Sequence, residues 1–177
     1  RQVRRVLQQN VIPAELRQRR EDRRRDYGRA VDDDDREAWP DFFRDDGVYK
    51  IVTRENHAAG LPMGILYCNS QGMRRDRVMA LRTANIFEPH THNHLLSRSR
   101  YTAGENGEVT GRTNFQVVRT MEHGQMDLFA VGKYLDRLDV SGDAPRFKER
   151  LVVPESRQTD VSPCHPRSRA PAGRARP

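Results

Sequence analysis

The second half of the chain is divided by turn-forming residues into four polar–apolar segments, and this division constrains the fold more than any other feature of the sequence. The segments are residues 91–104, 108–121, 124–140 and 144–156. The turns between them contain Gly-Glu-Asn-Gly, Glu-His-Gly and Ser-Gly-Asp-Ala-Pro, and glycine and asparagine at this spacing favour antiparallel hairpins. We therefore predict a run of antiparallel strands over this half of the chain.

Helices are predicted before these strands. Residues 14–31 are rich in alanine, leucine, glutamate, glutamine and arginine, which are good helix formers. Residues 33–35 are aspartates suited to cap a second helix, because a carboxylate accepts hydrogen bonds from free N–H groups at the positive end of a helix. Residues 70–87 predict a third helix. Helices followed by a run of strands indicate an α+β fold.

The segments between the predicted helices are assigned from their composition. Asp45-Asp46-Gly47 is typical of a turn, and β-branched and aromatic residues predict a strand over Val48–Thr53. Residues 54–72 are expected to form a loop with a short apolar centre. A partial apolar face of the third helix is expected from Met73, Arg77, Met79, Ala80 and Leu81.

A curved sheet folded over the helices is the simplest way to bury the apolar residues of the later segments. The residues expected in this core are Phe115, Val117, Phe129, Val131, Tyr134, Phe147 and Val152. The first helix has a poorly apolar face in its first half, which we expect to be solvated or to meet a partner. That face carries Leu16, Arg20, Arg23, Tyr27 and Ala30.

The positive charge of the chain is concentrated at its two ends. Residues 1–29 contain ten arginines and four acidic residues, and residues 157–177 contain five arginines and one acidic residue. Since the formal net charge is +7, the part between them is mildly acidic. A basic domain would suggest nucleic-acid binding, but basic ends on an acidic body do not, so no nucleic acid is expected as a partner.

A chain of 177 residues is long enough for one domain with its own core. We expect a flexible basic segment over residues 1–13 and a single domain over residues 14–160. From Ser162 onward the chain has four prolines and no aliphatic residue larger than alanine, which predicts a disordered tail over residues 161–177. The composition of this tail resembles a GC-rich gene read out of frame, and we hypothesise a frameshifted or misassigned C-terminus.

Several functional classes lack their sequence signals. Cys68 and Cys164 are far apart and unpatterned, which argues against a disulfide framework or a cysteine-rich metal site. No apolar run approaches the length of about 20 residues that spans a membrane, and no secretory h-region is present, so a cytoplasmic protein is expected. The sequence also contains no glycine-rich phosphate loop, no nucleophile elbow and no Cys/His pattern for an iron–sulfur cluster.

Three histidines, His90, His92 and His94, alternate along the first predicted strand of the second half and would share one face of it. On a straight strand, His90 and His94 lie roughly 13 Å apart, so all three cannot bind one ion, although two neighbours could. An iron triad would need two histidines and a carboxylate, and Glu88 is on the same nominal face. Two other interpretations remain open. The segment is a polar, half-exposed strand, or His92 or His94 is a general acid–base group oriented by an aspartate.

Two charged clusters have competing interpretations. The aspartate run Asp32–Asp35 could bind a cation, but calcium loops alternate their ligands and contain a glycine, so a solvated helix cap is favoured. The arginines within Arg17–Arg20 and Arg23–Arg25 could bind phosphate. They lack interleaved aromatic residues, which favours a charged helix surface or an interface to an acidic partner.

Five motifs occur in order between Tyr27 and Glu155: W-x-x-F-F-x-D-D-x-x-Y, D-R-V-x-A-L, H-x-L-x-x-x-R, F-x-V-x-R-T and G-x-Y-x-D-x-L. As a set, they resemble the small (β) subunit of bacterial aromatic-ring-hydroxylating dioxygenases. These enzymes are Rieske-type non-haem iron oxygenases, and their β subunits belong to the NTF2-like superfamily. The sequence departs from the family at His92, where members usually carry arginine or tyrosine, and after Asp160, where they usually have a final apolar strand.

The resemblance implies a cone-shaped α+β fold of the NTF2-like type, with N-terminal helices packed on a curved, mostly antiparallel mixed sheet. It implies contacts between β subunits and assembly with a Rieske oxygenase α subunit, usually as an α3β3 hexamer. The α subunit would hold the Rieske [2Fe–2S] cluster and the mononuclear iron. This chain would then contain no catalytic, cofactor-binding or metal-binding residue.

The function implied by the resemblance is that of a non-catalytic subunit in the bacterial catabolism of aromatic compounds. The segment of residues 53–73 is most similar to members acting on aromatic carboxylates. The alternative is a stand-alone NTF2-like dehydratase or isomerase with His92 or His94 as general base, since one fold hosts both.

Overall fold

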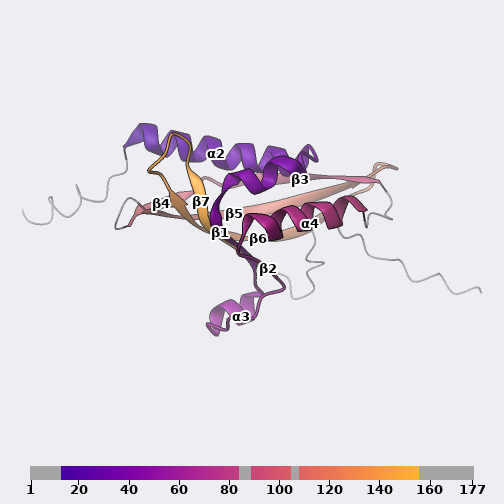
Figure 1. Ribbon diagram of the computed structural model, residues 1–177. Coiled ribbons are helices and arrows are strands. Elements are labelled where there is room, and N and C mark those ends of the chain that lie inside the picture. Colours follow the sequence, from indigo (N-terminus) through magenta and orange to yellow (C-terminus); the bar gives the residue numbers. More distant parts are fainter. Residues whose placement is uncertain (1–12, 84–88, 105–107, 156–177) are drawn as a thin grey trace, which may run out of the picture.

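The computed structural model describes residues 13–83, 89–104 and 108–155, and it places a layer of helices on one face of a mixed sheet (Figure 1). The first half contains α2 (Ala14–Asp32), the 3₁₀ helix η1 (Arg36–Phe42), β1 (Phe43–Ile51), α3 (Arg54–Ala58), β2 (Leu66–Cys68) and α4 (Gln71–Thr83). The second half contains β3 (His90–Leu96), β4 (Arg100–Ala103), β5 (Glu108–Met121), β6 (Met126–Asp139) and β7 (Arg146–Pro154).

The seven strands are ordered β2-β1-β7-β6-β5-β3, with β4 also paired to β5. The β1–β7 pair is parallel and the other pairs are antiparallel. The predicted α+β fold with a mostly antiparallel mixed sheet is therefore confirmed. The first of the four predicted strand segments forms two strands, β3 and β4, which pair in succession with β5.

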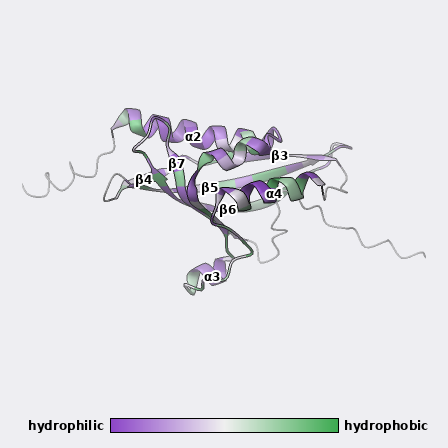
Figure 2. Cartoon of the chain, in the orientation of Figure 1, coloured by the Kyte–Doolittle hydropathy of each residue, from purple (hydrophilic) through white to green (hydrophobic). Residues whose placement is uncertain are grey.

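The helices α2, η1 and α4 lie over the inner face of the sheet, whereas α3 lies away from them (Figure 1). The helix α2 is hydrophilic along most of its length, as its colouring in Figure 2 shows. None of the helices in the described residues is long and apolar enough to cross a membrane.

Three irregularities in the strand register curve the sheet. Phe129 has no partner where β5 pairs with β6, and Lys148 has no partner where β6 pairs with β7. The register of β1 against β7 shifts between Phe43 and Val48. Extra residues of this kind bend a strand and increase its local twist, so the sheet curls around the helices.

The predicted turn Asp45-Asp46-Gly47 is wrong. These residues lie inside β1, which begins at Phe43 and ends at Ile51 rather than at Thr53. Pairing with β7 converts the local turn signal into a strand irregularity. At Gly47, a side chain would bring a Cβ atom within 2.8 Å of the Phe147 carbonyl oxygen.

The predicted cap of the second helix is also wrong. The helix is a short 3₁₀ segment, and Asp35 precedes it without a capping hydrogen bond from its side chain. The carboxylate of Asp34 instead pairs with Arg36, 2.5 Å away, and with Arg82 of α4. Asp34 therefore connects η1 with α4 through Arg36 and Arg82.

The two long helices lie where the sequence predicts them, but the buried face of α4 is not the predicted one. The helix α2 confirms the helix predicted over residues 14–31, and α4 lies within the one predicted over residues 70–87. The buried residues of α4 are Arg74 and Val78, whereas Met73 and Met79 are exposed. The Arg74 guanidinium reaches into the irregularity of β1 and donates to the carbonyl oxygens of Arg44 (2.7 Å) and Gly47. The arginine therefore stabilises backbone that lacks sheet partners.

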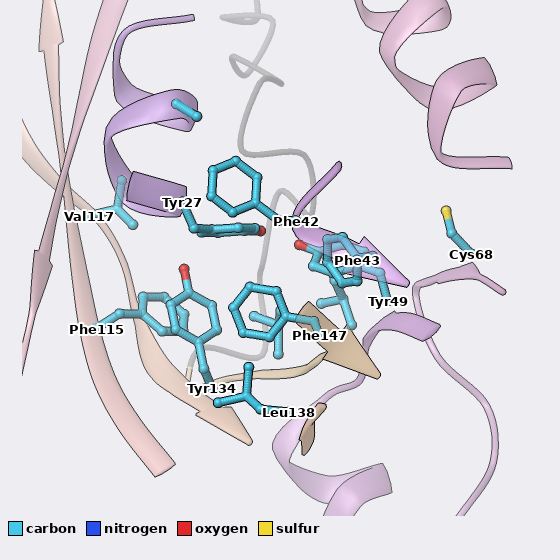
Figure 3. Close-up of a cluster of buried hydrophobic side chains, with 13 residues drawn as sticks. Tyr27, Phe42, Phe43, Tyr49, Cys68, Phe115, Val117, Tyr134, Leu138 and Phe147 are labelled. Atoms are coloured by element: carbon cyan, nitrogen blue, oxygen red, sulfur yellow. The ribbon is translucent and has the colours of Figure 1, made fainter. Parts of the chain in front are cut away.

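The core is a cluster of aromatic side chains between α2 and the sheet (Figure 3). Five of the seven core residues predicted from the sequence are buried in it, and Phe129 packs against its edge. Val131 is the exception, because the strand period places it on the opposite face from Gly132 and Tyr134. The other rings of the cluster come from Tyr27, Phe42, Phe43 and Tyr49.

A buried ion pair lies at the centre of these rings. Arg150 of β7 is 0% exposed and donates two hydrogen bonds of 2.8 Å to the carboxylate of Asp136 on β6. The guanidinium carbon lies 3.8 Å from the ring centroid of Phe147, 4.1 Å from that of Tyr27 and 4.5 Å from that of Tyr134. This pair joins β6, β7 and α2 in one contact.

Replacing Gly132 by alanine is expected to lower the free energy of unfolding by about 1–3 kcal/mol, because overpacking forces the backbone apart. A Cβ atom at this position would lie 2.5 Å from the Val153 carbonyl oxygen and 2.7 Å from Phe115 Cζ. Gly72→Ala is the matched control, since its Cβ atom would meet nothing closer than Ser70 Oγ at 3.9 Å. Urea denaturation measures both, and equal stability of the two variants would contradict the close approach.

Asp136→Ala is expected to destabilise the chain by about 3–5 kcal/mol, because it leaves the Arg150 charge buried without a partner. The neighbouring cross-strand pair provides a control, since Glu149 lies opposite Arg137 in register and both are partly exposed. Glu149→Ala is expected to cost far less, because exposed ion pairs contribute little. A loss of similar size in both variants, measured by chemical denaturation, would refute the central role of the buried pair.

Candidate functional site

A half-open cavity of about 130 Å³ lies between the helices and the inner face of the sheet. Its walls are mostly apolar and include Phe115, Val117, Phe129, Tyr134 and Val152, three of which are labelled in Figure 3. A few polar side chains also line it, namely Arg36, Arg77, His92 and His94. An apolar pocket with a few convergent polar groups is the usual form of a small-molecule site.

The histidine run lies on β3, and its three side chains share the inner face as the spacing predicts. His90 and His92 are in edge-to-face contact with ring centroids 4.8 Å apart, and His92 lies 5.0 Å from the ring of Phe129. His94 instead contacts the end of α2. The run is therefore divided between two environments.

His92 lies beside Phe129 in the apolar part of the cavity wall. Burial lowers its pKa to about 4, and the nearby His90 and His94 act in the same direction. Its Nε2 atom is buried and has no hydrogen-bond partner among the described residues. His92 is therefore neutral at pH 7, with an unsatisfied ring nitrogen on a residue that lines the cavity.

His94 is held by Asp32 at the C-terminal end of α2. The carboxylate accepts the His94 backbone N–H at 2.8 Å and contacts the ring Nδ1 at 2.5 Å. Since a carboxylate accepts, the proton of this contact is on Nδ1, which orients the ring and leaves Nε2 as the other functional atom. An aspartate beside His92 or His94 was expected from the sequence, but the sequence did not indicate which aspartate it would be. Asp32 carried no separate signal within a run of four aspartates.

The metal interpretation of the histidines finds no support in the geometry. No group of three or more histidine, cysteine, aspartate or glutamate side chains in residues 13–83, 89–104 and 108–155 is placed to hold a metal ion. The third candidate ligand, Glu88, lies outside the described residues. The aspartate run does not form a cation site either, because Asp32 binds His94 and Asp34 binds arginines.

The arginine-rich face of α2 packs on the sheet, which corrects the expectation that its first half is solvated or meets a partner. Arg20 is 2% exposed and lies over the ring of Tyr101, and Arg24 is 6% exposed and donates to the Ser97 carbonyl oxygen. Arg23 covers the ring of Phe42 at 4.2 Å. Arginine stems and flat guanidinium groups thus replace the apolar stripe of an ordinary helix.

The outer face of the sheet carries exposed apolar side chains from three adjacent strands. Leu95, Met126 and Leu128 are 52%, 69% and 60% exposed, and the half-buried Val118 lies opposite Leu128 in register. We call these four residues the outer-sheet patch. It contains no ionisable side chain, which is unusual for a solvent-facing surface and typical of an interaction site.

Comparison with known proteins assigns the chain to a family. The family model for the ring-hydroxylating β subunit matches residues 28–157. The chain belongs to this family. Its fold is accordingly NTF2-like, with helices on an open, mostly antiparallel mixed sheet.

Three relatives show the extent of the similarity. The β1 subunit of the terminal oxygenase component of terephthalate 1,2-dioxygenase from Comamonas is 40% identical over 135 residues, which are 76% of this chain and 88% of the relative. The small subunit of anthranilate 1,2-dioxygenase from Burkholderia cepacia is 41% identical over 123 residues, which are 70% and 76% of the two chains. A crystal structure from Novosphingobium aromaticivorans, assigned as a β subunit of an aromatic-ring-hydroxylating dioxygenase, has a TM-score of 0.71 and 39% identity, covering 77% of this chain and 86% of that one.

Membership in this family explains why the chain carries the chemistry of neither a cluster nor an iron site. In ring-hydroxylating dioxygenases the β subunit carries no cofactor, and the cluster and iron reside on the α subunit. The Asp32–His94 contact is the geometry that the alternative, a stand-alone dehydratase or isomerase, would need. Family membership favours the subunit over that alternative, and fold alone would not have decided between them.

The protonation of His92 gives a test of this site. Its pKa in the folded protein is about 4, whereas an unfolded chain takes up the proton near pH 6.5. As the pH falls from about 6.5 to about 4, the unfolded state gains a proton that the folded state does not, so stability is lost over this window and not below it. NMR titration should report the low pKa, and the stability of His92→Phe should depend less on pH there. A His92 ring that titrates at or above pH 6.5 would contradict its burial.

Proposed function

We propose that this chain is the β subunit of a cytoplasmic α3β3 ring-hydroxylating dioxygenase that acts on aromatic carboxylates. Its role is to support the assembly of the catalytic α subunit, and its own residues take no part in the oxygenation. The match to the β-subunit family over residues 28–157 carries this proposal. The substrate class is supported by relatives whose names specify terephthalate and anthranilate, both aromatic carboxylates.

The outer-sheet patch supports assembly. Its apolar side chains come from β3, β5 and β6, which are adjacent in the sheet, so they lie on one face of it. Each exposed aliphatic side chain that is covered by a partner contributes about 1.5–3 kcal/mol when fully buried. A partner that covers this surface removes its apolar side chains from water, and this stabilises the complex. Subunits of permanent complexes bury apolar surface in this way.

We assign the patch to contacts between β subunits. In a threefold ring, the patch of one β subunit is covered by a different face of the next β subunit. Covering it removes no charged group from water, because its four residues are uncharged. The partner α subunit would then contact other faces of the chain, and a ring of three β subunits would stand beside three α subunits. Heterologous contacts that close in a ring are the standard route to threefold symmetry.

Co-expression with a Rieske oxygenase α subunit is expected to yield an α3β3 particle, with all of the iron bound to the α subunit. Native mass spectrometry and metal analysis of the separated subunits measure both. A chain that stays monomeric beside a soluble, iron-loaded α subunit would contradict the proposal.

Leu128→Asp and Met126→Asp are expected to break the α3β3 particle into smaller species, since each places a charge in the apolar contact. The matched control is Met79→Asp, because Met79 is 65% exposed but lies on α4, outside the patch. Size-exclusion chromatography with light scattering follows the masses. An intact hexamer with Leu128→Asp, or equal disruption by Met79→Asp, would remove the patch from the interface.

A further inference from the structure

We propose that this half-open cavity is itself a binding site for a single-ring aromatic monocarboxylate of about the size of benzoate. The residues that would hold the ligand all belong to this chain. It goes beyond the assembly role, because a subunit that only supports assembly needs no internal ligand.

The size of the cavity selects a small ligand. Its volume is about 130 Å³. A protein cavity of about 150 Å³ with apolar walls is known to take up benzene, so a space of this size holds one aromatic ring.

The walls select a flat apolar body. Phe115 and Tyr134 stack on each other with ring centroids 4.4 Å apart, and both rings line the cavity together with Phe129. Val117 of β5 and Val152 of β7 complete this part of the wall from inward positions on either side of β6. Aromatic walls of this kind favour an aromatic guest, which gains ring contacts beyond simple burial.

Two buried polar atoms on residues that line the cavity have no hydrogen-bond partner among the described residues. They are Nε2 of His92 and Nη1 of Arg36. A buried polar atom without a hydrogen bond is destabilising, and native proteins satisfy nearly all of them. A ligand with a hydrogen-bonding group would satisfy an atom of this kind.

The charges around the cavity select an anion. Arg36 lines it, and His92 is neutral because its pKa is about 4. Among the described residues, no carboxylate lines this cavity, and Asp34, which contacts Nε of Arg36 at 2.5 Å, leaves Nη1 of Arg36 without a partner. A carboxylate on the ligand matches the planar guanidinium group better than a neutral amide or hydroxyl does.

The test uses the full-length chain and benzoate as the probe. Trp39 lines the cavity and is the only tryptophan of the sequence, so its fluorescence reports binding directly, and calorimetry gives the stoichiometry. We expect saturable binding of one benzoate per chain. Benzamide, which has the same shape without the charge, should bind about tenfold more weakly, since hydrogen bonds to charged groups are the stronger ones.

Three variants locate the site. Arg36→Met keeps most of the side-chain volume and should weaken benzoate binding at least about tenfold. His92→Phe keeps the ring without the nitrogen and should weaken it severalfold. Ala130→Leu fills the cavity, which Ala130 lines, and should abolish binding. Arg54→Met is the control, because Arg54 lies on α3 and pairs with Glu155, so binding should be unchanged.

The outcomes separate the proposal from its rivals. No saturation by benzoate up to tens of millimolar, or unchanged binding in Ala130→Leu, would overturn it and leave the cavity to water. Equal affinity for benzoate and benzamide would overturn the proposal that the site selects a carboxylate. This comparison uses the unmodified chain, so it does not depend on a variant that could misfold. None of these results bears on the α3β3 assembly, which is measured separately.

Discussion

The buried pair of Arg150 and Asp136 is the interaction on which the rest of this fold depends. Burial by itself would lower the pKa of Arg150, but the carboxylate of Asp136 and its hydrogen bonds outweigh this and raise it. The rings of Phe147, Tyr27 and Tyr134 surround the guanidinium group and supply contacts that water would otherwise make. A buried ion pair often contributes no more to stability than apolar residues of similar size would. We infer that this pair serves instead to fix one arrangement of β6, β7 and α2.

That arrangement positions the inner surface of the molecule. Asp136 lies opposite Arg150 in register, one residue before the irregularity that begins at Arg137. The pair therefore holds β6 and β7 together where the sheet begins to bend. The pair also fixes Tyr27 of α2 over the sheet, because the Tyr27 ring lies against the guanidinium group. With α2 fixed, Asp32 at its end meets His94 on β3, and the cavity remains open between helix and sheet. One ion pair thus connects sheet curvature, helix position and the shape of the cavity.

The sequence predicted the strands of the second half, the two long helices and five of the buried core residues, because periodicity and turn residues depend on local chemistry. The loop predicted over residues 54–72 was wrong in part, since it contains α3 and β2. It did not predict the burial of Arg20, Arg24, Arg74 and Arg150, because hydropathy treats arginine as a surface residue. Each of these arginines is buried against aromatic rings, backbone carbonyl oxygens or a carboxylate, and those partners are supplied by distant parts of the chain. The turn predicted at Asp45-Asp46-Gly47 was wrong for the same reason, since only pairing with the distant β7 includes that segment in a strand. Family resemblance supplied what local signals could not, which was the functional class.

The inner cavity and the outer-sheet patch lie on opposite faces of the same strands, and this separation has a functional consequence. Residues alternate between the two faces, so Val117 lines the cavity while its neighbour Val118 belongs to the patch. An assembly contact on the outer face therefore leaves the inner face free to hold polar groups and a ligand. The two faces remain coupled through one backbone, because the register irregularity at Val117 and Val118 leaves Phe129 in the cavity wall and Leu128 in the patch.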